Sequence, residues 1–514
     1  MVFTDRVGSS PTSGTSFMNF DHIAHTALNA LELSRVSYGD IKVGQYQKEH
    51  IATKDGVVEA MESNDSMGYG IRVVKDGRWG FAASSDLSSA GIHATVKKAV
   101  VLARAAATVK ADPVILTQES PLRGTYKTPY AEDPFTVSMD EKVSLLLAAD
   151  ESQRRVKHLK ISQAYYTGWK QEKLFASTQG HWITQTLVEC GGGIEATATN
   201  ASDVQSRSFP NSFRGQFVTG GFENVRGMKL IDNGQRIAEE AVALLSADEC
   251  PGGKRDIILD GNQLALQIHE SCGHATEGDR ALGWEASYAG TTFLTPDKLG
   301  TFRYGAPIVN LTADATVPLG LGTFGYDDEG VAAQRRYLVR NGIFVDYQTS
   351  REVASILQKT VPGYDRSSGG TVRSEGWGHL PMIRMTNINL EPGDNAQSGK
   401  AWKLSDLLAD TKNGIFFSTN KSWSIDDKRL NFQFGTEIAW EIKNGKRGRM
   451  LKNATYTGMT PVFWGSCDAI CGRDHWVVWG TPNCGKGQPS QLMHTGHGAS
   501  PARFRGVDVG VLKR

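Results

Sequence analysis

The chain has 514 residues, of which 22% are charged, and its formal net charge at pH 7 is +1. This length exceeds one ordinary core, so we expect two or three domains that bury a substantial apolar interior. Balanced charge without a Lys/Arg block argues against a nucleic-acid partner. The lack of a signal-peptide pattern or a long apolar run predicts a cytoplasmic protein with no membrane partner.

The N-terminal part is predicted to combine helices with an antiparallel meander. Apolar residues recur at helical spacing from Phe20 onward. Alternating segments follow, and they break at Asp55-Gly56 and Asp76-Gly77, which are dipeptides typical of tight hairpin turns. An Ala-rich stretch over 89–109 then predicts a second helix that packs on the sheet.

The middle of the chain repeats the mixed pattern and then becomes rich in strands. Ser138 is placed to cap a helix, strand-like segments run through 161–199, and a further helix is predicted at 233–247. After the breaker at 250–255, short strands and turns such as Asn341-Gly342 dominate. We predict an α+β fold with a mixed helix/antiparallel-sheet N-terminal half and a β-rich C-terminal catalytic half. The predicted segments are a disordered tail at 1–18, an N-terminal α+β domain at 19–115, a central α+β segment at 116–250 and a C-terminal domain at 251–514.

The stretch LQIHESCGHATEGDRA places His269 and His274 five positions apart. A preceding strand and a capping residue, Asp260 or Asn262, predict that the stretch lies on a helix. Five residues of a regular α-helix turn roughly 500°, which leaves the two side chains about 140° apart. Both imidazoles can reach one ion only if the helix has a π-type turn or ends at Gly273 and swings His274 back.

This histidine pair suits zinc, because imidazole nitrogens are good zinc ligands and an open coordination position can hold a water molecule. Glu270, next to a ligand, is placed to take the proton of that water as a general base. Two histidines do not complete a catalytic site, so a third ligand is expected from elsewhere in the chain.

Several further blocks give the sequence a family likeness. HESCGHATEGD resembles the HExxxH motif of the TldD/PmbA metallopeptidases, including the glycine before the second histidine. The blocks YDDEG, PMIRMTNINLEPGD and NCGKGQP follow in the family's order, and YGDIKV and GYGIRVVKDGRWGFAAS resemble its N-terminal domain. The likeness covers nearly the whole chain.

The resemblance implies a zinc ion held by His269, His274 and Cys484, with Glu270 as general base. It also implies hydrolysis of short or unfolded peptides and a dimer, including a heterodimer with a related subunit that lacks the metal motif. Two alternatives stay open, namely a non-catalytic partner subunit of a peptidase complex and an amide hydrolase of a biosynthetic pathway. The intact motif and Cys484 argue against the first.

The remaining polar candidates allow more than one interpretation. Glu277 is a solvent-facing carboxylate, an acceptor that orients an imidazole, or a ligand in place of Cys484. His494 and His497 are not part of the pattern of the better-known bacterial members of the family. We expect them either to contact substrate or to lie in a flexible polar loop. Lys486 would favour a Cys484 thiolate in an exposed turn. The Cys467/Cys471 pair, with His475 nearby, suggests either a second metal site or ordinary thiols, and we prefer the thiols; Cys272 is interpreted as a small buried side chain.

Overall fold

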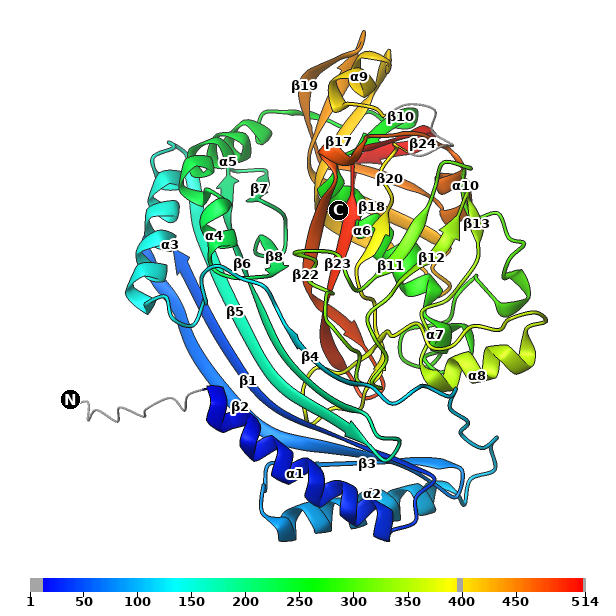
Figure 1. Cartoon of the computed structure of the whole chain (residues 1–514). Helices are drawn as coiled ribbons and strands as arrows, with labels where there is room; N and C mark the ends of the chain where they lie inside the picture. Colours follow the sequence, from blue (N-terminus) through cyan, green and yellow to red (C-terminus); the bar gives the residue numbers. More distant parts are fainter. Residues whose placement is uncertain (1–12, 395–400, 512–514) are drawn as a thin grey trace, which may run out of the picture.

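The computed structural model describes residues 13–394 and 401–511. The first half of the chain forms one long curved sheet with helices on its outer side, and the strand-rich second half lies on the other side (Figure 1). The predicted fold class, a mixed N-terminal half and a β-rich C-terminal half, is confirmed. No helix among the described residues is long and apolar enough to cross a membrane.

The N-terminal sheet has the strand order β3-β2-β1-β5-β6-β4, and β7 and β8 pair with β6. Only the β4–β6 pairing is parallel. Asp55 and Asp76 adopt φ of 50° and 52° at the two predicted hairpin turns, each followed by a glycine. The strands are β1 (Tyr38–Lys54), β2 (Val57–Lys75), β3 (Arg78–Ser84), β4 (Arg123–Lys127), β5 (Leu159–Ser177), β6 (Trp182–Thr199), β7 (Val204–Phe209) and β8 (Gln216–Thr219).

Helices cover the two ends of this sheet (Figure 1). One buried apolar cluster joins α1 and α2 to the β1–β3 end, and another joins α3, α4 and α5 to β5 and β6. As the capping pattern predicted, the Ser138 side chain accepts a hydrogen bond from the backbone of Glu141. The helices are α1 (Ser13–Leu33), α2 (Ser89–Ala106), α3 (Met139–Arg154), α4 (Glu223–Gly227) and α5 (Leu230–Leu244).

The division into segments stays a prediction, and the structure adds two facts about the N-terminal part of the chain. α1 begins at Ser13, seven residues before the expected start at Phe20, so the tail predicted at 1–18 includes helical residues; its part at 1–12 lies outside the described residues. Segments 19–115 and 116–250 share one sheet, because β1 pairs with β5 along 15 consecutive positions from Asp40 to Lys54. Non-local strand pairing of this kind leaves no local mark in a sequence.

The C-terminal half is built on an eight-stranded sheet whose main path is β17-β10-β24-β20-β18-β19-β9, with β21 beside β24. A four-stranded sheet, β13-β12-β11-β16, and two hairpins, β14–β15 and β22–β23, complete it. These strands are β9 (Asp248–Glu249), β10 (Gly253–Leu259), β11 (Leu311–Asp314), β12 (Arg335–Arg340), β13 (Ile343–Phe344), β14 (Val372–Arg373), β15 (Met382–Ile383), β16 (Ile388–Leu390), β17 (Asn413–Ile425), β18 (Asn431–Lys443), β19 (Lys446–Lys452), β20 (Ala454–Met459), β21 (Cys467–Ile470), β22 (Val477–Lys486), β23 (Gln491–Ala499) and β24 (Ala502–Val511).

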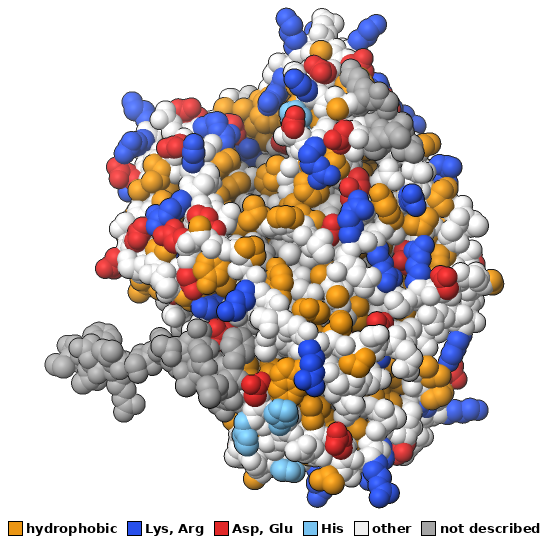
Figure 2. All heavy atoms as spheres, in the orientation of Figure 1, with side chains coloured by type: hydrophobic (Ala, Val, Ile, Leu, Met, Phe, Trp, Pro, Cys, Tyr) orange, Lys and Arg blue, Asp and Glu red, His pale blue; other side chains and the backbone are white. Residues whose placement is uncertain are grey.

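Short helices connect these strands, and one large buried apolar cluster runs beneath them. The connections are α6 (Gly261–Ile268), η1 (His269–Gly273), η2 (His274–Thr276), α7 (Gly278–Ala281), η3 (Pro296–Lys298), α8 (Arg351–Thr360), α9 (Leu404–Ala409), α10 (Thr460–Gly465) and η4 (Arg473–His475). The face of the molecule in Figure 2 carries Lys/Arg and Asp/Glu side chains interspersed, without an extended basic patch.

A buried charge cluster joins the two halves. Asp328 of the C-terminal half lies 2.9 Å from the Lys42 ammonium of β1 and 3.0 Å from the Lys173 ammonium of β5. Burial would raise the pKa of the Asp328 carboxyl, but the two lysines outweigh it and hold that pKa well below its usual range. The cluster therefore fixes the C-terminal half against the concave side of the N-terminal sheet.

Candidate metal centre

The helix that carries the two histidines is irregular in the way their spacing requires. Asp260 caps α6, and at His269 the regular helix gives way to a π-turn, in which the backbone N–H of His274 donates to the carbonyl of His269. The wider turn brings the second imidazole round to the side of the first, and the ring centroids lie 4.8 Å apart. The predicted irregularity before His274 is confirmed.

Gly273, at the end of this π-turn, serves close packing rather than an unusual backbone angle. Its φ and ψ of −53° and −63° are ordinary helical values, so no unusual backbone angle calls for glycine. Instead, a Cβ at this position would lie 2.1 Å from Met385 Sδ. The glycine allows the histidine helix to pack closely against the segment that precedes β16.

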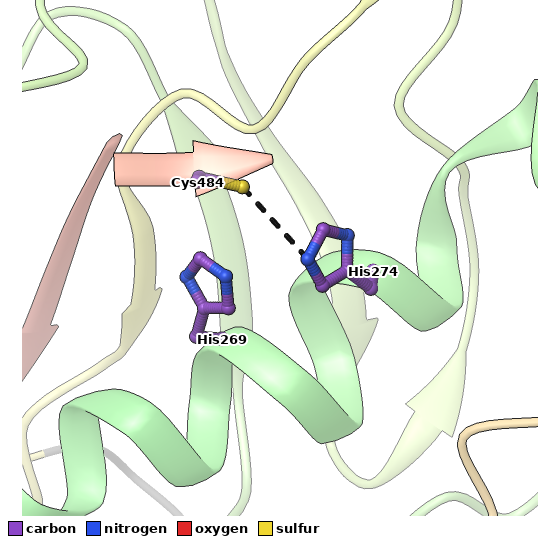
Figure 3. A group of neighbouring side chains, drawn as sticks. All are labelled: His269, His274 and Cys484. Carbon is purple, nitrogen blue, oxygen red and sulfur yellow. Dashed lines mark hydrogen bonds between the residues drawn. The ribbon is translucent and has the colours of Figure 1, made fainter. Parts of the chain in front are cut away.

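Cys484 joins the two histidines from a distant part of the chain (Figure 3). Its Sγ lies 3.8 Å from His274 Nε2, and one ligand atom each from His269, His274 and Cys484 lie within 4.8 Å of one another. The predicted exposed turn is wrong: Cys484 belongs to β22 opposite Met493, next to a register shift in the hairpin, and is buried. Pairing with β23 turns the thiol inward.

The donor atoms of these three side chains, two imidazole nitrogens and one thiol sulfur, are of the types that zinc prefers. Zinc bonds of roughly 2.0 Å to nitrogen and 2.3 Å to sulfur at tetrahedral angles place the two donor atoms about 3.5 Å apart. The separation of 3.8 Å between His274 Nε2 and Cys484 Sγ is close to that value. Among the described residues, this is the only group of three or more His, Cys, Asp or Glu side chains arranged to hold a metal ion.

A buried carboxylate sets the tautomer of His274. Glu277 Oε2 lies 3.0 Å from His274 Nδ1, and a carboxylate can only accept, so Nδ1 donates and Nε2 presents its lone pair toward Cys484. Burial raises the pKa of Glu277, but Lys486 and His274 reverse this effect and bring it well below its usual range. Of the interpretations for Glu277, the acceptor that orients an imidazole matches the structure, and the solvent-facing carboxylate is wrong.

The protonation states of the candidate ligands also favour metal binding. Burial lowers the pKa of both His269 and His274, which keeps their imidazoles neutral. Burial would raise the pKa of the Cys484 thiol, yet Arg384 and His274 together lower it from its ordinary value. The prediction that Lys486 favours the Cys484 thiolate is wrong, and Arg384 lowers the thiol pKa instead. The Lys486 ammonium pairs with the carboxylates of Asp279, Glu277 and Glu285.

Glu270, the predicted general base, is buried and paired with a residue that the sequence analysis missed. Arg429, in the turn between β17 and β18, places Nη1 2.7 Å from Glu270 Oε2. Its Nη2 donates to the Ala289 carbonyl at 3.4 Å. No local pattern links Arg429 to the histidine helix, because the two lie 159 positions apart.

Three family models together match most of the chain. PmbA/TldA metallopeptidase domain 1 matches residues 39–103, the central domain of this family matches 132–247, and its C-terminal domain matches 252–510. The chain belongs to the PmbA/TldA metallopeptidase family. The third match alone spans half of the chain and contains all three candidate ligands.

Relatives named as metalloproteases agree with PmbA/TldA membership, and a solved structure shares the fold. A metalloprotease of Methanocaldococcus jannaschii is 29% identical over 82% of this chain and 86% of its own length, and one of Methanothermobacter thermautotrophicus is 28% identical over 93% and 96%. A Saccharolobus solfataricus protein named a zinc metalloprotease TldD homolog is 23% identical over 40% of this chain and 42% of its own length. TldE from Thermococcus kodakarensis shares the fold, with a TM-score of 0.68 at 15% identity over 96% of this chain and 100% of its own.

The other histidines and cysteines considered in this PmbA/TldA member either lie apart from the three candidate ligands or contact one of them. The flexible loop expected at His494 and His497 is wrong, because both lie on β23. His494 Nδ1 lies 2.6 Å from Glu189, whereas His497 contacts His269. Cys467 and Cys471 are buried, and burial raises the pKa of Cys471 to about 12, as expected of ordinary thiols. Cys272 is likewise a small buried side chain of the core.

Proposed function

We propose that this PmbA/TldA family member is a zinc-dependent peptidase, with His269, His274 and Cys484 as the zinc ligands and Glu270 as the general base. The observation that carries the proposal is the convergence of three ligand atoms within 4.8 Å, drawn from a π-turn and a strand about 210 positions away. Zinc is favoured by the N/S donor set and by the name of the Saccharolobus solfataricus relative.

The protein's side chains divide the chemical work among them. Bound zinc supplies a Lewis acid that polarises the scissile carbonyl and lowers the pKa of a water molecule. Glu270 accepts a proton from the attacking water and returns it to the leaving amine. Arg429 holds the Glu270 carboxylate in place, and Glu277 keeps Nδ1 of His274 protonated so that Nε2 can bind.

The substrates we propose are short or unfolded peptides. A cavity of about 310 Å³ lies between the N-terminal sheet and the β22–β23 hairpin, and Tyr46, Trp169, Pro482 and Met493 are among its lining residues. One of these lining residues, Met493, is the strand partner of Cys484 in the β22–β23 hairpin. An extended peptide suits such a space because its backbone can be held with little demand on its side chains.

The test combines metal analysis with peptide cleavage. Purified protein should contain about one zinc ion per chain, hydrolyse unstructured peptides, lose this activity with a chelator and regain it with added zinc. Zinc-free protein with full activity would overturn the proposal. Activity only on non-peptide amides would favour the biosynthetic alternative instead.

Assembly is a separate proposal that rests on the family resemblance. We propose a dimer, either of two copies or with a related subunit that lacks the metal motif. Native mass spectrometry of the chain alone and with such a relative would distinguish the two forms. A monomer in both samples would contradict the proposal.

A further inference from the structure

His497, for which the sequence allows substrate contact or a place in a flexible loop, packs directly against a candidate metal ligand. His497 lies on β23 with no solvent exposure, and its Nε2 is 2.8 Å from His269 Nδ1. The two rings meet at an interplanar angle of 76° with centroids 4.8 Å apart. The contact therefore uses the ring nitrogen of His269 that is left over when Nε2 serves as the metal ligand.

The second nitrogen of His497 decides the direction of this hydrogen bond. His497 Nδ1 lies 3.3 Å from the carbonyl oxygen of Ile388, which can only accept, so Nδ1 carries a proton. In a neutral imidazole the other nitrogen, Nε2, is then an acceptor. His269 Nδ1 must donate to it, and His269 Nε2 keeps its lone pair. The Thr495 hydroxyl also lies near this nitrogen, 3.3 Å from His497 Nε2.

We propose that His497 is a positioning residue for the metal centre, which fixes the Nδ1-protonated tautomer and the ring orientation of His269. This rests on the proposed zinc site. His497 does for the first histidine what Glu277 does for the second, so each imidazole ligand has its own buried acceptor. Removing an acceptor of this kind typically lowers metal affinity by about 10- to 100-fold.

The opposite tautomer shows why the acceptor matters. If His497 presented an N–H at Nε2, two donors would face each other unless the His269 proton moved to Nε2. The nitrogen needed for zinc would then be blocked. A neutral acceptor also adds no further negative charge to a site that already holds the Cys484 thiolate and the Glu270 and Glu277 carboxylates.

Zinc affinity of point variants provides the first test. His497→Leu should weaken zinc binding about 10- to 100-fold in a chelator competition, whereas His497→Gln, whose amide oxygen can accept the same bond, should lie within a few fold of the parent. His494→Gln is the matched control on the same strand, and its zinc affinity should equal that of the parent. Cobalt-loaded His497→Leu should show altered d–d absorption, which a structural role alone would not produce.

The same measurements can overturn the inference. Zinc affinity of His497→Leu within twofold of the parent, or a loss in His497→Gln as large as in His497→Leu, would reject the acceptor role. If His497→Leu does not fold, long-range nitrogen–proton NMR of ¹⁵N-histidine-labelled, metal-free parent protein decides. His269 protonated on Nδ1 supports the inference, and protonation on Nε2 overturns it. Because this readout needs no metal, it separates failure here from failure of the proposed zinc peptidase.

Discussion

Glu270 and Arg429 form a partly buried ion pair, with 2.7 Å between Oε2 of the carboxylate and Nη1 of the guanidinium. The pair joins the π-turn that carries the histidines to the turn between β17 and β18. A charged hydrogen bond of this kind fixes a carboxylate more firmly than a neutral one. We therefore expect Arg429 to orient Glu270, the proposed general base.

Replacing Glu270 with Gln should leave zinc in place and lower peptide hydrolysis by at least about 10²-fold. Glutamine keeps the size of the side chain and can accept a hydrogen bond, but it cannot take a proton from water. Zinc content by mass spectrometry and kcat on an unstructured peptide check both halves. Loss of zinc in this variant would instead make Glu270 a ligand.

Replacing Arg429 with Met should lower kcat by about tenfold or more while zinc content stays unchanged. The substitution leaves the Glu270 carboxylate without its charged partner in a buried site, so the carboxylate is no longer held in one orientation. Arg449→Met is the control, because Arg449 is half-exposed and pairs with Asp248 and Glu441 away from the metal centre. Equal kcat in both variants would refute the positioning role.

Replacing Cys484 with Ser should remove most of the bound zinc and the activity. A neutral hydroxyl is a much poorer zinc ligand than a thiolate. Cys467→Ser and Cys471→Ser should keep their zinc, because both thiols belong to the core rather than to the ligand group. If Cys484→Ser bound zinc normally and Glu277→Gln did not, the third ligand would be the carboxylate.

Gly273→Ala should destabilise the protein by about 1–3 kcal/mol through overpacking. The new methyl group would lie 2.1 Å from Met385 Sδ, so either the methionine or the π-turn must move. We also expect Gly273→Ala to weaken zinc binding, because the π-turn positions His269 and His274. Adding Met385→Ala should recover part of this affinity, since it provides the missing space. Denaturant unfolding and chelator competition on the single and double variants measure both effects, and a single variant as stable as the parent would contradict the packing argument.

Asp328→Asn should destabilise the protein at pH 7 by about 3–5 kcal/mol, because it leaves Lys42 and Lys173 without their shared buried partner. The pKa of Asp328 in the folded protein is lowered, so its ionisation stabilises the fold above the unfolded-state pKa of about 3.9 and loses this effect as the pH falls below it. The difference between parent and variant should thus be full at pH 7 and smaller at pH 3. A constant difference across this range would show that ionisation of Asp328 is not its source.

Local features of the chain could be predicted because they depend on neighbouring residues. The five-residue spacing of His269 and His274 is incompatible with a regular helix and one metal ion, so it predicts either a π-turn or a helix end at Gly273, and the structure has the π-turn. The hairpin turns at Asp55 and Asp76 and the cap at Ser138 likewise follow from short-range backbone chemistry. Cys484 was identified as a candidate by family resemblance rather than by any local rule.

Only the tertiary structure decided which distant groups surround the candidate ligands. Arg429 on Glu270, His497 on His269 and Arg384 beside Cys484 all come from segments whose contacts are set by sheet pairing and hairpin register. Lys486, two positions from Cys484, points instead into a cluster of carboxylates. Cys484 and Lys486 lie on the same face of β22, but their neighbours come from elsewhere in the fold: Arg384 lies beside the thiol, and three carboxylates surround the ammonium. The contacts that tune the candidate metal centre are therefore properties of the packed protein rather than of its motif.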